Sequence, residues 1–170
     1  MGSHLTPKER LQPSLLDRLA DDAPTEQRES RDKRVLSIQR LRECVLRDLG
    51  WLFNTSNLQA VQELDARVAG SVLNYGMPDL SGCTSSSLDV SVLERMMRQA
   101  ILDFEPRILP RTLRVNAVVA DEQMNRNALT FEIEGELWAQ PLPLKLLLTT
   151  EIDLESGDVA IKDSSGSAAY

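Results

Sequence analysis

The side chains that most often do chemistry in proteins are scarce in this chain. It has one histidine, His4, in a polar N-terminal stretch, and two cysteines, Cys44 and Cys83, that do not form a Cys-x-x-Cys pair. Nucleophile systems built on serine or cysteine need an imidazole in a rigid frame, and zinc sites usually combine several His and Cys ligands. The sequence therefore predicts no nucleophilic catalysis and no metal or cofactor site. It predicts that both cysteines are buried apolar side chains.

Carboxylates are the other candidates for chemistry. Glu132, Glu134 and Glu136 alternate along one stretch, and alternate residues of a strand project side by side about 7 Å apart. We interpret them as a solvated face and not as a cation site. A glycosidase needs two carboxylates facing across a cleft. Glu105 with Asp103, or Glu132 with Glu134, could be nominated, but no sequence feature puts either pair in an apolar pocket.

A charged pair on a rigid corner stands out at Glu105-Pro106-Arg107. Proline cannot continue a helix and fixes its own backbone angle, so Pro106 should end the preceding helix. Two interpretations stay open. Glu105 and Arg107 pair within the domain and fix the turn from helix to strand, or they dock on a partner, where little entropy is lost and desolvated charges are selective. The motif by itself favours pairing within the domain.

Composition and charge narrow the function classes. The chain has 170 residues, 42% of them apolar and 26% charged, which favours one domain. Its apolar runs are far shorter than the roughly 20 residues of a membrane-spanning helix, and no leader of signal-peptide form opens it, which predicts a cytoplasmic protein. The net charge of -7 arises in residues 121–170, which hold three basic and ten acidic side chains. That field repels nucleic acid and favours a basic protein partner.

The patterning divides the chain into three parts. We predict a flexible arm with a short amphipathic segment over residues 1–34, a folded domain over residues 35–162, and a disordered tail over residues 163–170. Helical periodicity predicts three helices. They are residues 31–49 ending at Gly50, residues 59–72, and a helix that begins with a capping box of Ser91 and Glu94 and ends at Pro106. The pair Met96-Met97 on the last helix is interpreted as core.

After Pro110 the apolar period changes to two, which is typical of strands. Strands are expected over residues 113–119, 129–137, 142–153 and 159–161, with a hairpin connection at 121–127. Helices first and strands last predict an α+β domain, with N-terminal helices packed on a small antiparallel or mixed C-terminal β-sheet.

Several stretches together carry a family resemblance. The corner Glu105-Pro106-Arg107 follows an apolar helix that contains LERMMRQAI and precedes a strand near Leu113. The other stretches are PSLLDRL in the arm, RDLGWLFNT, and SVLNYGMPDL. With this setting the chain resembles the TssE family, the small baseplate subunits of type VI secretion systems, and the related gene-25-type, lysozyme-like GpW family of contractile-phage baseplate wedge proteins. The resemblance covers roughly residues 11–162.

The resemblance implies an assembly role and not an enzyme. Glu105 and Arg107 would be polar anchors and Pro106 a rigid spacer that dock on the core bundle of TssF and TssG, within a baseplate that also holds TssK. The C-terminal strands would template the sheath proteins TssB and TssC, at the cytoplasmic side of the inner membrane. It implies no cofactor, no nucleic acid and no membrane insertion. A muralytic, lysozyme-like glycosidase and an unrelated protein-interaction adaptor stay open as alternatives.

Overall fold

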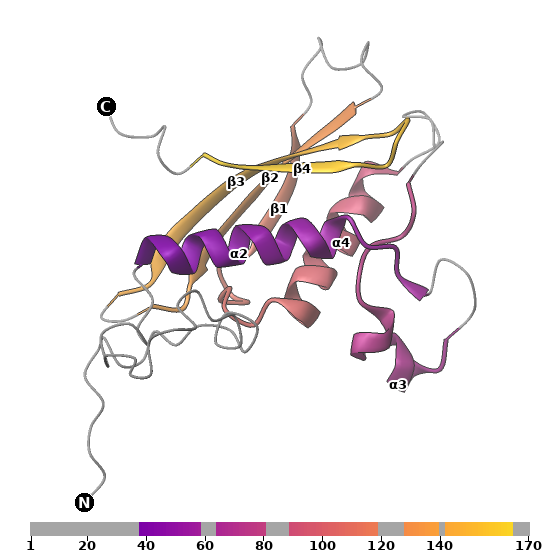
Figure 1. Ribbon diagram of the computed structural model, residues 1–170, viewed down its shortest axis with the longest axis horizontal. Helices are drawn as coiled ribbons and strands as arrows, with labels where there is room; N and C mark the ends of the chain where they lie inside the picture. The colour runs from indigo at the N-terminus through magenta and orange to yellow at the C-terminus, as the bar shows by residue number, and fades with distance from the viewer. Residues whose placement is uncertain (1–37, 59–63, 81–88, 119–127, 140–141, 165–170) are drawn as a thin grey trace, which may run out of the picture.

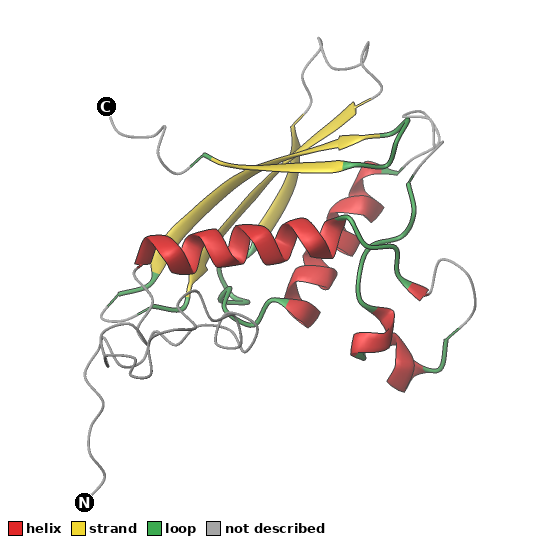
Figure 2. Ribbon diagram, viewed as in Figure 1, coloured by secondary structure: helices red, strands yellow, loops and turns green. Residues whose placement is uncertain are grey.

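The computed structural model describes residues 38–58, 64–80, 89–118, 128–139 and 142–164. Its helices are α2 (Ile38–Phe53), α3 (Ala66–Ala69), the 3-10 helix η4 (Val72–Asn74) and α4 (Val90–Phe104), and its strands are β1 (Arg114–Val118), β2 (Ala128–Leu137), β3 (Leu144–Asp153) and β4 (Val159–Asp163). Helices therefore precede strands, and the predicted α+β class is confirmed (Figures 1 and 2). No helix in the described ranges has both the length and the apolar character to cross a membrane.

Some predictions fall outside the described residues. They concern His4 and the arm of residues 1–34, Cys83, the connection at 121–127, and the tail after Ser164. Cys44 is described, and its side chain is buried as predicted, in a small cluster with Leu41 and Ala139.

The sheet is antiparallel throughout, in the order β1-β2-β3-β4. Strands β2 and β3 form its centre and pair along their whole length, from Ala128 opposite Asp153 to Leu137 opposite Leu144. One face is buried and the other is exposed. On β2, for example, Phe131 and Ile133 are fully buried while Glu132 is exposed. Because only one face is apolar, both α2 and α4 pack on that face, and the core lies between them and the sheet.

The exposed face carries both signs of charge. Glu132 and Glu134 are exposed and Glu136 is partly exposed, so the predicted solvated face is confirmed. The register also brings bases to it, since Arg114 lies opposite Glu134 and Lys145 lies opposite Glu136. Glu132 and Glu151 instead face neutral cross-strand neighbours, which are Asn116 and Thr149 for Glu132, and Thr130 and Ala160 for Glu151. The acidic part of this face is therefore centred on Glu132 and Glu151.

Helix α4 packs through the stripe that its periodicity predicts. Leu93, Met97, Ala100 and Ile101 are buried, whereas Met96 is 43% exposed, so only one of the two methionines belongs to the core. The predicted capping box is wrong. The N-cap is Asp89, whose side chain accepts hydrogen bonds from the backbone N–H groups of Ser91 and Val92. The Glu94 carboxylate instead accepts from the N–H of Ala117 at 2.7 Å, so it serves β1 and not its own helix.

Two helix predictions need correction. Helix α2 does not end at Gly50 but continues to Phe53, because Leu52 and Phe53 extend its buried face. Of the helix expected over residues 59–72, residues 59–63 lie outside the described part, and the rest holds only the short α3, which Gly70 ends. Val72 is 80% exposed. This segment therefore lacks the burial that stabilises a longer helix.

Gly50 offers a direct test of the corrected helix. A Cβ added at Gly50 would meet no atom within 4 Å, and alanine has a higher helix propensity than glycine. We expect Gly50→Ala to raise the free energy of unfolding by about 0.5 to 1 kcal/mol, measured by urea denaturation. Gly76 is the contrasting control, since its φ is 119° and a Cβ there would lie 2.1 Å from the Thr55 carbonyl oxygen. Gly76→Ala should cost at least about 2 kcal/mol. A loss of stability in Gly50→Ala would contradict the helix at this position.

Candidate functional site

The corner Glu105-Pro106-Arg107 is fixed on both sides by backbone hydrogen bonds. Glu105 is the C-cap of α4, and its N–H donates to the carbonyl of Ile101 at 2.8 Å. Beyond the corner, the buried Ile108 donates to the carbonyl of Glu105 at 3.2 Å and forms a bridge with Leu137 at the end of β2. Trp138 donates to the carbonyl of Arg107 at 2.7 Å. The corner is therefore held between the end of α4 and the end of β2.

The two charges of the motif bind each other. The Arg107 Nε donates to Glu105 Oε1 at 2.6 Å, and its Nη2 donates to Glu105 Oε2. The same Nη2 donates to Asp48 Oδ2 at 2.5 Å, so the guanidinium also reaches α2. Glu105 is only 3% exposed, and the Arg107 side chain is 22% exposed. A carboxylate buried this deeply needs its cation, since an uncompensated buried charge is strongly destabilising.

Asp48 extends the network along α2. Its Oδ1 accepts from both Nε and Nη2 of Arg47, at 2.9 and 2.8 Å. The Arg47 guanidinium lies 4.9 Å from the ring centroid of the half-exposed Trp51, which is the geometry of a cation–π contact. The charges thus alternate from Arg47 through Asp48 and Arg107 to Glu105, and their formal sum is zero.

The electrostatics follow from this arrangement. Burial by itself would lower the pKa of Arg107, but the hydrogen bonds and charges of Glu105 and Asp48 outweigh burial and raise that pKa above its ordinary value. Tyr75, whose hydroxyl donates to the backbone carbonyl of Asp48 at 3.4 Å, also has a raised pKa. Burial is the main cause for Tyr75, and the negative charges of Asp48 and Glu105 add to it. Arg107 therefore stays charged and Tyr75 stays neutral near pH 7.

The structure realises the first of the two interpretations of the motif. Glu105 and Arg107 pair within the domain and fix the turn from α4 to the sheet. Pro106 is exposed at the tip of the corner, with the accessible part of Arg107 beside it. Docking of this corner on a partner stays a prediction.

The sequence reasoning missed Asp48. It lies four residues after the buried Cys44 and four before the buried Leu52, so it occupies a place on the apolar stripe of α2. A charge within such a stripe is a signal, because buried charges are paired. This position was the available signal that Asp48 needs a cation, but nothing in the sequence shows that this cation is Arg107.

The carboxylates nominated for glycosidase chemistry do not form a facing pair. Both oxygens of Glu105 are bound by Arg107. Asp103 is exposed and accepts from Nε2 of Gln99 at 2.8 Å. Glu132 and Glu134 lie in the open on the outer face of the sheet. A glycosidase instead places one carboxyl group in an apolar pocket, across a cleft from a second.

Comparison with known proteins identifies the class. A family model described as "Baseplate wedge protein gp25" matches residues 39–142, which is more than half of the 170 residues. The chain belongs to this family of structural baseplate proteins. The matched segment includes α2 from its second residue, the whole of α4 and the whole corner. Neither the curated proteins nor the solved structures contain a match to the chain.

The network makes Arg107 the residue on which the corner depends. We expect Arg107→Ala to lower the free energy of unfolding by about 3 kcal/mol, because it leaves the Glu105 carboxylate buried without a cation. Arg47→Ala removes a partly exposed pair with Asp48 and the cation–π contact with the half-exposed Trp51, but it leaves no buried charge without a partner, so it should cost less, about 1 kcal/mol. Chemical denaturation of both variants beside the wild type measures the difference. Equal losses would mean that the burial of Glu105 is not what the network stabilises.

Proposed function

We propose that this chain is a TssE-like structural component of a type VI secretion baseplate, assembled at the cytoplasmic side of the inner membrane. Membership of the gp25 family supports a structural baseplate role. The stretches RDLGWLFNT and SVLNYGMPDL, which resemble TssE, support the secretion apparatus over a phage tail. Its proposed partners are the baseplate subunits TssF, TssG and TssK, and the sheath proteins TssB and TssC.

The main support for the proposed contact with the TssF–TssG core bundle is that the corner is rigid and that the charges of its network sum to zero. Docking of a fixed corner loses little conformational entropy. Desolvation of the charges is also less costly, because Arg107 already has Glu105 and Asp48 as partners. In this arrangement Pro106 and the accessible part of Arg107 contact the bundle, while Glu105 holds them in place.

The exposed face of the sheet is the proposed contact with the sheath. Its acidic centre at Glu132 and Glu151 suits a partner with basic side chains, and charge complementarity gives both selectivity and faster association. Strand β3 is central in the sheet and contributes the buried Leu146, Leu148 and Ile152. Deletion of β3 would therefore disrupt the core, so the sheath contact is tested by substitutions on the surface of the sheet.

The corner is tested by adding a charge at its exposed tip. Pro106→Glu leaves the Glu105–Arg107–Asp48 network in place, and it introduces a carboxylate that docking would desolvate without a partner. We expect this variant to lose co-purification with TssF and TssG while its circular dichroism spectrum stays unchanged. Ser91→Glu is the matched control, because it adds the same charge at an exposed position at the other end of α4. A complex that survives in Pro106→Glu would leave the corner with a purely structural role.

The sheath contact is tested by charge reversal. We expect the double variant Glu132→Lys and Glu151→Lys to bind the TssB–TssC sheath proteins at least about tenfold more weakly, with a smaller dependence on salt concentration. Titration by biolayer interferometry at two salt concentrations measures both effects. The double variant Glu43→Lys and Asp103→Lys, at exposed positions on α2 and α4, is the control because it changes the net charge by the same amount. Equal affinities for wild type and the Glu132→Lys and Glu151→Lys variant would exclude this face as the contact.

A further inference from the structure

Trp51 is a large apolar side chain that the fold leaves half in water. It stands in the last turn of α2, next to the buried Leu52, and it is 50% exposed. Tryptophan side chains bury most of their surface on average, and they are enriched among the residues that dominate protein–protein interfaces. The exposed half of this indole is therefore a candidate contact.

Trp51 lies on the side of α2 that faces the corner. Residues three and four positions apart are neighbours on a helix surface, so Trp51 adjoins both Asp48 and Arg47. Arg107 of the corner bonds Asp48, and the Arg47 guanidinium lies 4.9 Å from the ring centroid of Trp51. The indole therefore continues the surface that begins at Pro106 and the accessible part of Arg107.

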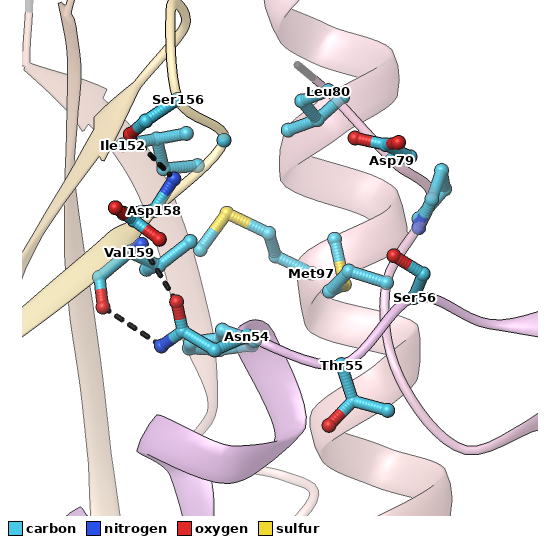
Figure 3. Close-up of a pocket in the computed structure, with 14 residues that line it drawn as sticks. Asn54, Thr55, Ser56, Asp79, Leu80, Met97, Ile152, Ser156, Asp158 and Val159 are labelled. Atoms are coloured by element: carbon cyan, nitrogen blue, oxygen red, sulfur yellow. Dashed lines mark hydrogen bonds between the residues drawn. The ribbon is translucent and has the colours of Figure 1, made fainter.

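The turn that carries Trp51 is fixed by the two residues that follow α2. The carbonyl of Trp51 accepts from Thr55 Oγ1 at 2.7 Å, and Asn54 Nδ2 donates to the carbonyl of Gly50 at 2.8 Å. Asn54 also binds β4, because its Nδ2 donates to the carbonyl of Val159 and its Oδ1 accepts from the N–H of Val159, both at 2.9 Å (Figure 3). The position of Trp51 is therefore fixed in advance, and docking on it orders little further chain.

The charges beside the indole are paired within the chain, and this pairing limits the chemistry of a partner. Asp48 accepts from Arg47 and from Arg107, and Arg107 also binds Glu105. A partner that brought a basic or acidic side chain to this point would bury a charge for which the paired network offers no counter-ion. The surface around Trp51 therefore suits a partner that is apolar and uncharged at the contact.

We propose that Trp51 is the apolar anchor of the corner's docking surface, and that the partner receives the indole in an uncharged apolar pocket. This proposal rests on the proposed docking of the corner on the TssF–TssG core bundle. Arg47 covers one face of the ring, so the partner contacts the rest of it. Pro106 and Arg107 fix the position of the partner, and burial of the exposed indole surface stabilises the complex.

Titration with the TssF–TssG complex tests the anchor and the chemistry of its pocket. We expect Trp51→Ala to bind at least about tenfold more weakly than wild type, and Trp51→Phe, which keeps an aromatic ring, to stay within about threefold. Trp51→Lys should bind no better than Trp51→Ala, because the pocket has no charge to pair with it. A Trp51→Lys variant that binds better than Trp51→Ala would mean an acidic pocket and would overturn the proposal.

Trp138→Ala is the matched control. Trp138 is the other of the two tryptophans and is 47% exposed, but it lies between the buried Leu137 and Ala139. Successive side chains of an extended segment point to opposite faces, so Trp138 belongs to the outer face of the sheet. We expect this variant to bind as tightly as wild type, with circular dichroism showing that both alanine variants are folded. Equal losses in Trp51→Ala and Trp138→Ala would overturn the assignment of the anchor.

The corner variant separates failure of the anchor from failure of the proposed function. If Trp51→Ala binds as tightly as wild type while Pro106→Glu does not bind, the anchor is overturned and the docking of the corner stands. If both variants bind as tightly as wild type, or if wild type binds neither subunit, the docking of the corner and the anchor are overturned together.

Fluorine NMR measures the burial of the indole directly, apart from any effect on folding. Fluorotryptophan incorporated into Trp138→Phe labels Trp51 alone, because the chain has two tryptophans. The fluorine shift of an exposed indole differs between light and heavy water. We expect this difference to vanish for Trp51 when the labelled chain is bound to TssF–TssG. A difference that is unchanged in the complex would mean that Trp51 stays in water there, and it would overturn the proposal.

Discussion

The contact between Glu105 and Arg107 is the constraint on which the arrangement of the helices and the sheet depends. A carboxylate that is 3% exposed stays in the interior only with a cation beside it. The cation that serves Glu105 also bonds Asp48, so one guanidinium joins the end of α4 to the middle of α2. The backbone of the same residue accepts from Trp138 just after β2. Helices α2 and α4 and the sheet therefore meet at Arg107. Hydrogen bonds at this residue, together with apolar packing, fix the orientation of the two helices relative to the sheet.

Helix α2 makes polar contacts with the corner and with β4, in addition to packing its buried stripe into the core. One side of it carries Asp48 toward the corner, and its two ends carry Arg42 and Asn54 toward β4. Gly50 lies between these contacts, with open space where a side chain would be. The helix is thus fixed to the corner and to the far edge of the sheet by polar groups on two sides, while Leu49 and Leu52 pack into the core between them.

Sequence patterns correctly predicted the features that depend on the side chains of a single helix or strand. The four strands followed from a period of two, and α4 followed from its apolar stripe and from Pro106, because both depend on the side chains of the element itself. The errors arose where two local signals compete or where a distant group decides. Asp89 and Ser91 both suit an N-cap, and Glu94 is drawn to β1 instead of its own helix. The pairing of Asp48 with Arg107 joins residues 59 positions apart, and that of Asn54 with Val159 joins residues 105 apart. No pattern within one element contains either contact.

The segment that matches the family is shorter than the segment that folds as one unit. The family match ends at residue 142, before β3 begins at Leu144. Yet Leu146, Leu148 and Ile152 of β3 are buried in the core with Phe131 of β2, and the edge of β4 is bonded by Asn54 from within the matched segment. Without these strands β2 would lose the partner that pairs with its whole length, and the core would lose the buried side chains of β3. The unit that folds around the corner therefore extends to Asp163, and the strands beyond the match contribute to the rigidity of the site that lies within it.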